Sequence, residues 1–478
     1  MLSDEIFHGW RNNFLSSNRV LQSLVNYMSD KNSVIVIGAG AAGMSAAVEL
    51  AEAGFAVSIL EARERIGGRM FTQRDPAIDA PIELGAEFIH GKPQETWKLL
   101  QAHNVPITEV DGDSWCVTEN GLTSCDFFSD VDKILEKMSE HDPDESFLYF
   151  LERCFSSDGH DTKLEEAKRR AIRYVSGFNA ADPGLVGTQW LVKEMRAEEQ
   201  IEGERAFHAG NGYADLVAIF RERMAKNRVS IETETVVERV KWKAGAAEIF
   251  APSPRGAVTL AAARVLVTVP LGVLQADAGN IGALEFVPGL PARKREAMRK
   301  LEMGKVIRVV LRFRHRFWDD IRPTKSKDLS SMSFLLSDDE WFPTWWTTVP
   351  RKLPLLTGWA PFEAGERLSG KSCDFVTEKS LETLHHLLGV SKEDLEGEFE
   401  AAYFHDWQSD PFSRGAYSYG KIGANAAQEE LARPLEGTLF FAGEATDLTG
   451  NNGTVHGAIA SGQRAAKEIV QSFTSRRK

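Results

Sequence analysis

Residues 33–43 read Ser-Val-Ile-Val-Ile-Gly-Ala-Gly-Ala-Ala-Gly, and this stretch decides the fold of the chain. The apolar run over 34–37 predicts a buried strand, and the segment after the glycines has the composition of a helix. Gly38 permits a tight turn, Gly40 lets the backbone approach a pyrophosphate, and Gly43 allows the helix to pack closely on the strand. The pattern therefore predicts a strand–turn–helix unit whose helix N-terminus faces phosphate groups.

A second apolar run, Val57 to Leu60, ends at Glu61. This carboxylate lies about 20 residues beyond the glycines, where a side chain can hold a ribose 2′-OH. An acid at this place favours an unphosphorylated adenosine ribose, so the sequence favours NAD or FAD over NADP. The order of the elements is far more specific than a lone G-x-G-x-x-G motif. It consists of a strand, the glycines, a helix that stops at Gly54, a second strand and an acidic residue.

Length and charge restrict the class of protein. The chain has 478 residues, too many for one ordinary core, so we expect two or three subdomains. Its net charge is −13, from 56 basic and 69 acidic residues, which argues against a partner made of nucleic acid. The negative potential is compatible with a cationic substrate, although acidity that serves only solubility is the simpler interpretation.

The cysteines and the N-terminus bear on the compartment. Neither metal-ligand spacing nor a disulfide-rich pattern occurs among the four cysteines, at positions 116, 125, 154 and 373, so they fit a reducing compartment. The first 31 residues begin with acidic residues and lack a long apolar core, which argues against a signal peptide and a membrane span. Apolar residues recur there at helical spacing and predict an amphipathic arm that docks on the body or on a partner. We expect a cytoplasmic protein with no metal and no membrane partner, and a homodimer is one possible assembly.

Composition changes along the chain suggest that one domain is inserted into another. Val229–Trp242 and Val258–Val269 each read as one strand, Val306–Phe313 as a third, and Thr454–Phe473 as a helix. We predict an arm over 1–32, a nucleotide-binding domain over 33–97, 205–284 and 401–478, and a substrate domain over 98–204 and 285–400.

Together, several separated motifs resemble the flavin-containing amine oxidases: the monoamine, polyamine and L-amino-acid oxidases and the lysine-specific histone demethylases. The resemblance covers about residues 33–473. Besides the first glycine motif with Glu61, it rests on Arg65–Arg69, Leu84–Ala86 with Ile89–Gly91, Thr268–Leu271, Asp410–Pro411 with Arg414–Tyr419, and Phe441–Glu444 with Thr454–Ala458.

The resemblance implies an α/β fold. Its parts are a Rossmann-like FAD-binding domain built from discontinuous segments and a substrate domain of mixed β-sheet flanked by helices. Ala416 stands where monoamine oxidases carry the cysteine that binds FAD covalently, so FAD should be noncovalent. The resemblance implies FAD contacts for Gly38, Gly40, Ala42, Gly43, Glu61, Ala62, Arg63, Gly68, Arg69, Leu84, Gly85, Ala86, Glu87, Val237, Trp407, Gly443, Glu444, Thr454 and Val455.

Specific roles follow from the resemblance. Arg63 and Arg69 should lie along the diphosphate and ribityl chain, and Leu84–Ala86 should line the isoalloxazine. The Val237 backbone should meet adenine, and Glu444 should hold the ribityl-phosphate region. Thr454 and Val455 begin a helix whose positive end should stabilise negative charge on the reduced flavin pyrimidine.

The family reaction moves a hydride equivalent from the carbon next to an amine to flavin N5; the imine hydrolyses, and O2 reoxidises the flavin to give H2O2. The implied partners are thus a small-molecule amine and O2. Tyr417 matches one wall of the family's aromatic cage. The second cage aromatic is not evident, because Asn451, Asn452, Gly453 and Thr454 occupy its neighbourhood. Glu87 and His90 lie on a loop that contacts substrate in polyamine oxidases, and they could hold an amine, shuttle its proton, or be structural.

The strand lysine that holds a water at flavin N5 in this family aligns with Arg308. An arginine can position water but cannot act as a base. Lys305, three residues earlier, should lie on the opposite strand face. The alternatives are therefore an FAD-dependent dehydrogenase or desaturase of the same fold with another electron acceptor, or a flavin-binding scaffold. Four tryptophans gather in the substrate domain, at 341, 345, 346 and 359; most should build core, and one or two could line a cavity.

Overall fold

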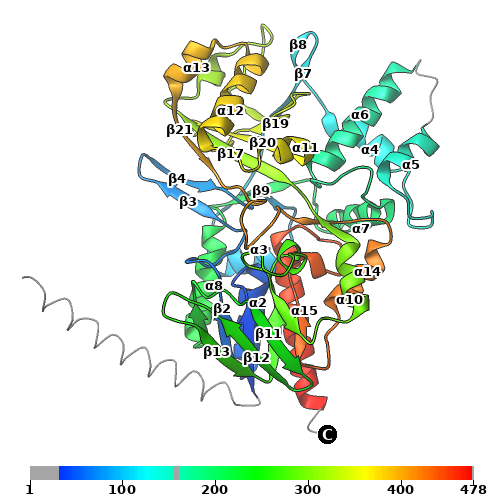
Figure 1. Ribbon diagram of the computed structural model, residues 1–478. Helices are drawn as coiled ribbons and strands as arrows, with labels where there is room; N and C mark the ends of the chain where they lie inside the picture. Colours follow the sequence, from blue (N-terminus) through cyan, green and yellow to red (C-terminus); the bar gives the residue numbers. More distant parts are fainter. Residues whose placement is uncertain (1–31, 156–160, 476–478) are drawn as a thin grey trace, which may run out of the picture.

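The computed structural model describes residues 32–155 and 161–475, so the predicted N-terminal arm lies outside the described residues. Figure 1 shows two parts: the first strands and the C-terminal helix in the lower half, and a second sheet with its helices in the upper half. No helix in these two ranges is long and apolar enough to cross a membrane.

Within the described residues, the lower half is built on a five-stranded sheet in the order β10-β2-β1-β14-β23, and all its neighbouring strands are parallel. Segments far apart in the sequence thus share one sheet, as a Rossmann-like domain requires. This confirms the predicted α/β fold. The bounds are β1 Ser33–Ile37, β2 Ala56–Leu60, β10 Ser230–Glu232, β14 Arg264–Val267 and β23 Leu439–Phe441.

Both faces of this sheet are covered, which explains why its strands are apolar throughout. Val34 and Val36 belong to a core cluster with α2, α8 and α15, whereas Ile35 and Ile37 belong to a cluster with a second sheet, in which β11, β12 and β13 are antiparallel and β15 is parallel to β11. Each such buried aliphatic side chain contributes about 1.5–3 kcal/mol. The covering elements are α2 Ala41–Glu52, α8 Ala214–Lys226, α15 Val455–Ser475, β11 Arg239–Lys243, β12 Ala246–Ala251, β13 Val258–Ala262 and β15 Glu285–Val287.

Two of the predicted long strands are wrong, because each is divided between sheets. Val229–Trp242 is divided into β10 and β11, which are separated by a loop in which Glu234 has a positive φ of 52°. Val258–Val269 is divided into β13 and β14, and the chain passes from the antiparallel to the parallel sheet between them. The apolar pattern continues across both breaks because every piece is buried.

The upper half contains a mixed sheet in the order β21-β17-β20-β19-β18-β7-β8. Its core is rich in aromatic residues and includes Trp115, Trp318 and Trp345. Two flanking helices, α11 and α12, contact β17. The bounds are β7 Asp113–Thr118, β8 Gly121–Ser124, β17 Val306–Phe313, β18 Met332–Leu336, β19 Thr344–Trp346, β20 Leu355–Pro361, β21 Phe399–Phe404, α11 Phe362–Leu368, α12 Cys373–Leu388 and α13 Lys392–Glu398.

Smaller elements connect the two halves. A three-stranded sheet, β5-β9-β6, and the hairpin β3-β4 lie between them. The helices α4 to α7 precede β9 in the chain. Their bounds are β3 Thr72–Asp75, β4 Ile78–Glu83, β5 Ile89–His90, β6 Ile107–Glu109, β9 Ala206–Ala209, α3 Gln94–Ala102, α4 Phe127–Leu135, α5 Phe147–Cys154, α6 Thr162–Gly177 and α7 Thr188–Glu199.

Cys116 and Cys125 form a disulfide, which differs from the expectation of four reduced thiols. The hairpin of β7 and β8 brings them together: Cys116 pairs with Thr123, and the Cys125 N–H donates to the Ser114 carbonyl. Cys154 and Cys373 are free and exposed. The spacing of the cysteines did not reveal this pair, but Asn120-Gly121 between them is a hairpin signal that could have revealed it.

Lys294 is fully buried and joins two helices beneath the parallel sheet. On α10, Ala292–Arg299, its ammonium donates to the carbonyls of Glu430, Leu431 and Arg433 at 2.9, 2.9 and 2.7 Å. These are the terminal carbonyls of α14, Ala424–Ala432, where a cation complements the helix dipole. The same ammonium lies 4.0 Å from the ring centre of Phe441 in β23.

We predict that Lys294→Met destabilises the protein by about 3 kcal/mol or more, because it removes three charge-assisted hydrogen bonds and leaves buried carbonyls without a donor. Lys241→Met, on the exposed side of β11, is the matched control and should change stability by less than about 0.5 kcal/mol. Urea unfolding of the two variants measures the difference; equal stabilities would contradict the role of Lys294.

Candidate functional site

The candidate site begins where the strands of the parallel sheet end. Gly38 follows β1, Glu61 follows β2, Thr268 follows β14, and Glu444 lies just after β23. Because the strands are parallel, these ends meet at one edge of the sheet, which is where nucleotides bind in such folds. The predicted FAD residues of the lower half therefore come together in space.

The glycine turn is shaped so that it excludes side chains. A Cβ on Gly43 would lie 2.0 Å from the Gly38 carbonyl oxygen, so α2 can pack this closely on β1 only with glycine. Gly38 itself has a positive φ of 104°. Around Gly40 there is open space: a Cβ there would meet nothing within 4 Å, and Gly68 lies against it. The turn therefore leaves room for a group that approaches the backbone of Gly40.

Glu61 is buried and organises the same turn. Its carboxylate accepts hydrogen bonds from the backbone N–H groups of Ala39, at 2.7 Å, and Arg63, at 2.9 Å. The carboxylate thus ties the end of β2 to the glycine turn. The ribose contact of Glu61 stays a prediction.

The two predicted phosphate-side arginines are already engaged by protein groups. Arg63 lies 2.8 Å from Asp410 in an ion pair. Arg69 donates to Glu444 at 2.9 Å and to the carbonyl of Ala416 at 2.8 Å. The other carboxylate oxygen of Glu444 accepts from the hydroxyl and N–H of Ser418 and from the N–H of Gly453, so Glu444 fixes the surrounding loops.

The segment predicted to line the isoalloxazine is held from both sides. A Cβ on Gly85 would lie 1.9 Å from the Arg69 carbonyl oxygen, so no side chain fits. The Ala86 N–H donates to that same carbonyl, and the indole of Trp407 donates to the carbonyl of Leu84 at 2.7 Å. Trp407 thus supports the backbone of this segment.

Two further features fit a bound FAD. Val237 is buried, and its backbone N–H has no hydrogen-bond partner among the described residues, whereas those of Val236 and Glu238 donate to Pro252 and Phe250. An unpaired buried N–H requires an acceptor, and an adenine nitrogen can supply one. In addition, Thr454 immediately precedes α15, whose free N–H groups lie next to Gly453, and Gly443 precedes Glu444 in a turn with a φ of 134°.

Arg308 of β17 reaches into the same site from the upper half. Its guanidinium donates to the Gly85 carbonyl at 2.8 Å and forms an ion pair with Glu87, whose side chain is only 9% exposed. The indole of Trp346 donates to the same Glu87 oxygen at 2.9 Å, and the guanidinium lies 5.3 Å from the Trp346 ring centre. Lys305 pairs instead with the exposed Glu366, as its predicted position on the opposite face requires.

Aromatic rings surround this polar cluster. Tyr417 packs on Gly453, and its hydroxyl donates to the Phe178 carbonyl at 2.6 Å. His90 lies with its ring 5.2 Å from that of Phe178, and burial lowers the pKa of His90 to about 4. The imidazole is therefore neutral at physiological pH. The structure thus brings Tyr417, His90, Glu87 and Arg308 together beside Gly85. We call this cluster, with the rings of Phe88, Phe178 and Trp346, the chamber.

The tryptophans divide as predicted between core and site. Trp345 is fully buried and donates to the Phe342 carbonyl, and Trp341 packs against Phe375. Trp346 and Trp359 face the chamber side and contact each other, with ring centres 5.8 Å apart. Sequence reasoning missed Phe88, Phe178 and His208, because none of them belongs to a recognised motif.

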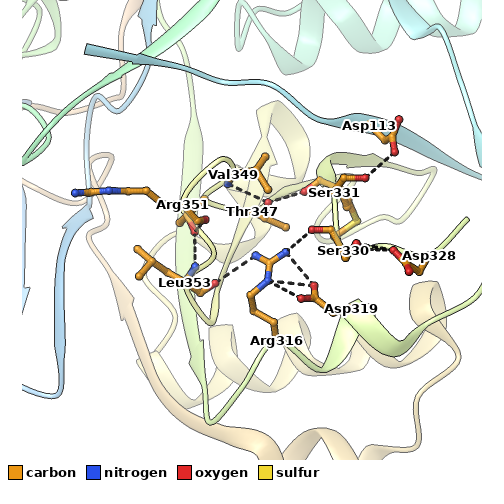
Figure 2. Close-up of polar contacts among 12 residues, drawn as sticks. Asp113, Arg316, Asp319, Asp328, Ser330, Ser331, Thr347, Val349, Arg351 and Leu353 are labelled. Carbon is orange, nitrogen blue, oxygen red and sulfur yellow. Dashed lines mark hydrogen bonds and ion pairs between the residues drawn. The ribbon is translucent and has the colours of Figure 1, made fainter. Parts of the chain in front are cut away.

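Residues 347–353 follow Trp346 directly and are held in place by side-chain hydrogen bonds; we call them the braced segment. Figure 2 shows Arg316 holding this segment: it donates to the carbonyls of Leu353 and Ser330 and pairs with Asp319. The Thr348 hydroxyl donates to the Arg351 carbonyl at 2.8 Å, and the Arg351 guanidinium points away from this cluster.

Comparisons with known proteins agree with this geometry. The family model described as flavin containing amine oxidoreductase matches residues 41–470. "Lysine-specific histone demethylase 1 homolog 3" of Arabidopsis thaliana is 28% identical, and the match covers 93% of this chain and 30% of that relative. "Protein FLOWERING LOCUS D" of the same plant is also 28% identical, and the match covers 94% of this chain and 56% of that relative. The chain therefore spans little more than half the length of these relatives at most. "Polyamine oxidase 3" of Oryza sativa subsp. japonica is 26% identical over 95% of this chain and 92% of its own.

Two solved structures share the fold. Wild-type putrescine oxidase bound to putrescine has a TM-score of 0.75 and 20% identity, with 92% of this chain and 99% of that chain covered. Cyclohexylamine oxidase from Brevibacterium oxydans IH-35A has a TM-score of 0.73 and 18% identity, with coverage of 93% and 99%. At these identities the likeness concerns the fold alone.

We predict that Gly43→Ala abolishes or strongly weakens FAD retention, because the new methyl group would push α2 away from β1 and disturb the glycine turn. Gly397→Ala in α13 is the matched control, since its Cβ would meet nothing within 4 Å. The ratio of flavin to protein absorbance after purification measures the effect. Full FAD content in Gly43→Ala would contradict this account of the turn.

Glu83, at the end of β4 next to Leu84, gives a prediction about pH. Burial raises its pKa from 4.5 to about 8, although the Tyr213 N–H and the Thr72 hydroxyl bind the carboxylate. Between these two pH values the folded protein binds a proton that the unfolded chain does not. This group therefore lowers the free energy of unfolding as pH rises from 4.5 to 8, by at most about 1.4 kcal/mol per pH unit.

Glu83→Gln removes this titration, so the stability of the variant should fall less between pH 5 and 8 than that of the wild-type protein. Urea unfolding at several pH values measures the slope, with exposed Glu119→Gln as control. Parallel curves for Glu83→Gln and wild type would show that Glu83 does not titrate in this window.

Proposed function

This chain belongs to the flavin containing amine oxidoreductases, whose model matches residues 41–470, and on that premise we propose that it oxidises a primary or secondary amine and passes the electrons to O2. As a member of this family it is an FAD-dependent oxidoreductase that acts on CH–NH or CH–NH2 groups. The identity of the amine and the use of O2 are the proposed parts.

The main support is the joining of two features at one place: a nucleotide site at the strand ends and an aromatic chamber beside Gly85. The residues that would hold FAD are the glycine turn, Glu61, the 84–86 segment and the start of α15. Bound FAD supplies the redox chemistry by accepting two electrons and a hydrogen from the substrate carbon. The residues of the chain position the substrate, exclude water from the site and set its electrostatic potential.

The walls of the chamber suit an amine. Phe88, Trp346 and Tyr417 limit water, which disfavours the charged ammonium and favours the neutral amine that reacts, whereas Phe178 is exposed. The net charge of −13 attracts cations to the protein, whereas the negative charge of Glu87 is paired with Arg308. Relatives named as a polyamine oxidase and as lysine-specific histone demethylases, and a fold neighbour named as putrescine oxidase, act on amines according to their names.

A second candidate, an FAD-dependent dehydrogenase with another electron acceptor, is favoured by one observation. The guanidinium of Arg308 binds the Gly85 carbonyl and Glu87. It is therefore not free to act near the flavin edge as the ammonium of a lysine would be. Its Nε has no hydrogen-bond partner among the described residues and could hold a water molecule. A flavin-binding scaffold is the third candidate.

Anaerobic mixing of the FAD-loaded protein with a panel of amines tests the proposal. The panel contains putrescine, spermidine, cyclohexylamine and a peptide with dimethylated lysine. We expect at least one of them to bleach the flavin absorbance near 450 nm, and peroxide to form once air is admitted. Bleaching without peroxide would favour the dehydrogenase, and no bleaching by any amine would favour the scaffold.

We predict that Arg308→Lys raises the rate at which O2 reoxidises the reduced flavin by about tenfold or more, equal to about 1.4 kcal/mol in the barrier. A lysine at this place is shorter and frees a point charge that can hold water. Arg312→Lys on the same strand, which pairs with Asp75 and Glu400, is the matched control. Stopped-flow mixing with O2 measures the rate; an unchanged rate would show that the alignment or the role is wrong.

A further inference from the structure

His208 lies on β9 between β5 and β6, in the small sheet beside the chamber. Its ring centre is 5.1 Å from that of Phe88, which also contacts Trp346 and His90. The alternating pattern of β9 buries Phe207 and Ala209 and turns His208 to the other face. This residue is therefore part of the chamber wall, although no motif singled it out.

Neither ring nitrogen of His208 makes a hydrogen bond within residues 32–155 and 161–475, and its Nε2 is buried. Its Nδ1 lies 3.8 Å from Oε1 of Glu87. The other oxygen of Glu87 is occupied by Arg308 and Trp346. Two donors thus hold Glu87 in place and leave its second oxygen facing an imidazole. Buried imidazoles rarely lack partners, so this one requires a ligand.

The charges that face His208 come from three segments. Burial is the largest cause that lowers the pKa of His208; Glu87 opposes it, and Arg308 and Arg351 add to it. Arg351 belongs to the braced segment of Figure 2, where its carbonyl accepts from the Thr348 hydroxyl. On β6, Thr108 stands opposite His208, and the neighbouring Glu109 is paired with Arg205. The imidazole is therefore neutral near pH 7 and can accept a proton.

We propose that His208 accepts the proton of the substrate ammonium, and that Glu87 stabilises the imidazolium that forms. One N–H bond of the ammonium breaks and one N–H bond forms on the imidazole, so the amine becomes neutral and its nitrogen lone pair is free. This inference rests on the proposed function. It assigns a base to a chamber in which Arg308 cannot be one.

His90, the other imidazole in the chamber, is less suited to this role. It packs between the rings of Phe88 and Phe178, and no carboxylate lies within ion-pair distance of it in the described residues. An imidazolium at His90 would have no counter-charge, whereas one at His208 has Glu87. We therefore assign the proton transfer to His208.

The test is the limiting rate of anaerobic flavin bleaching, measured with the amine of the panel above that reacts fastest. The range is pH 4.5 to 9, because burial lowers the pKa of His208 below its ordinary value of 6.5. In wild-type protein the rate should fall at low pH, where His208 is protonated. His208→Asn should lower the limiting rate about 100-fold, within the usual range for general base catalysis, and should lose this acidic limb. Added imidazole should restore part of the rate. Glu87→Gln should move the limb to lower pH, because Glu87 raises the pKa of His208.

Exposed His315→Asn is the matched control and should behave as the wild type. Unchanged FAD content in each variant shows that the fold is kept. A His208→Asn protein that keeps the wild-type rate and pH profile, or a lowered rate that imidazole does not restore, would overturn this inference alone. A wild-type protein whose flavin no amine bleaches would overturn both this inference and the proposed function.

Discussion

The parallel register of the five-stranded sheet is the constraint on which the rest of the structure depends. It brings the ends of strands that are separated by up to about 400 residues to one edge, so that Gly38, Glu61 and Glu444 share a site. The backbone geometry there allows no side chain at Gly43, because α2 must lie against β1. The buried carboxylate of Glu61 then ties the glycine turn to the next strand through two backbone N–H groups.

The second half of the site is added by contacts between the two sheets. Arg308 of β17 binds the Gly85 carbonyl and Glu87, and Trp407, which follows β21, binds the Leu84 carbonyl. Both sets of contacts come from the upper sheet, from β17 and from the residues after β21, and they hold the same short segment, residues 84–87, in place. The chamber is thus a property of the junction between the sheets, and its charge pattern is set by the ion pair of Arg308 with Glu87.

Much of the fold could be predicted from local sequence pattern. Val306–Phe313 occurs as predicted because it is a self-contained apolar strand. The run Val258–Val269 was predicted wrongly because burial continues while the chain changes sheets, and hydropathy does not record that change. The Cys116–Cys125 disulfide does not follow from cysteine spacing, although Asn120-Gly121 between the two cysteines signals the hairpin that joins them.

For the site, the motifs predicted which residues meet but not what each side chain does there. Arg63 and Glu444 are present at the nucleotide site, but Arg63 forms an ion pair with Asp410 and Glu444 forms one with Arg69. The pairing of Glu87 with Arg308 joins residues 221 positions apart, and no spacing rule reaches that far. His208 lies on a short strand without a motif, so its position beside Glu87 follows only from the register of β9 with its neighbours.

The grip on residues 84–87 has a consequence for how a reactant enters. Opening the protein by swinging one half away from the other would expose Arg308 and Glu87 as separated, formerly buried charges, at a cost of about 3–5 kcal/mol. Hinge motion is therefore an unfavourable route. Substrate and product should instead reach the site by movements that leave this ion pair intact.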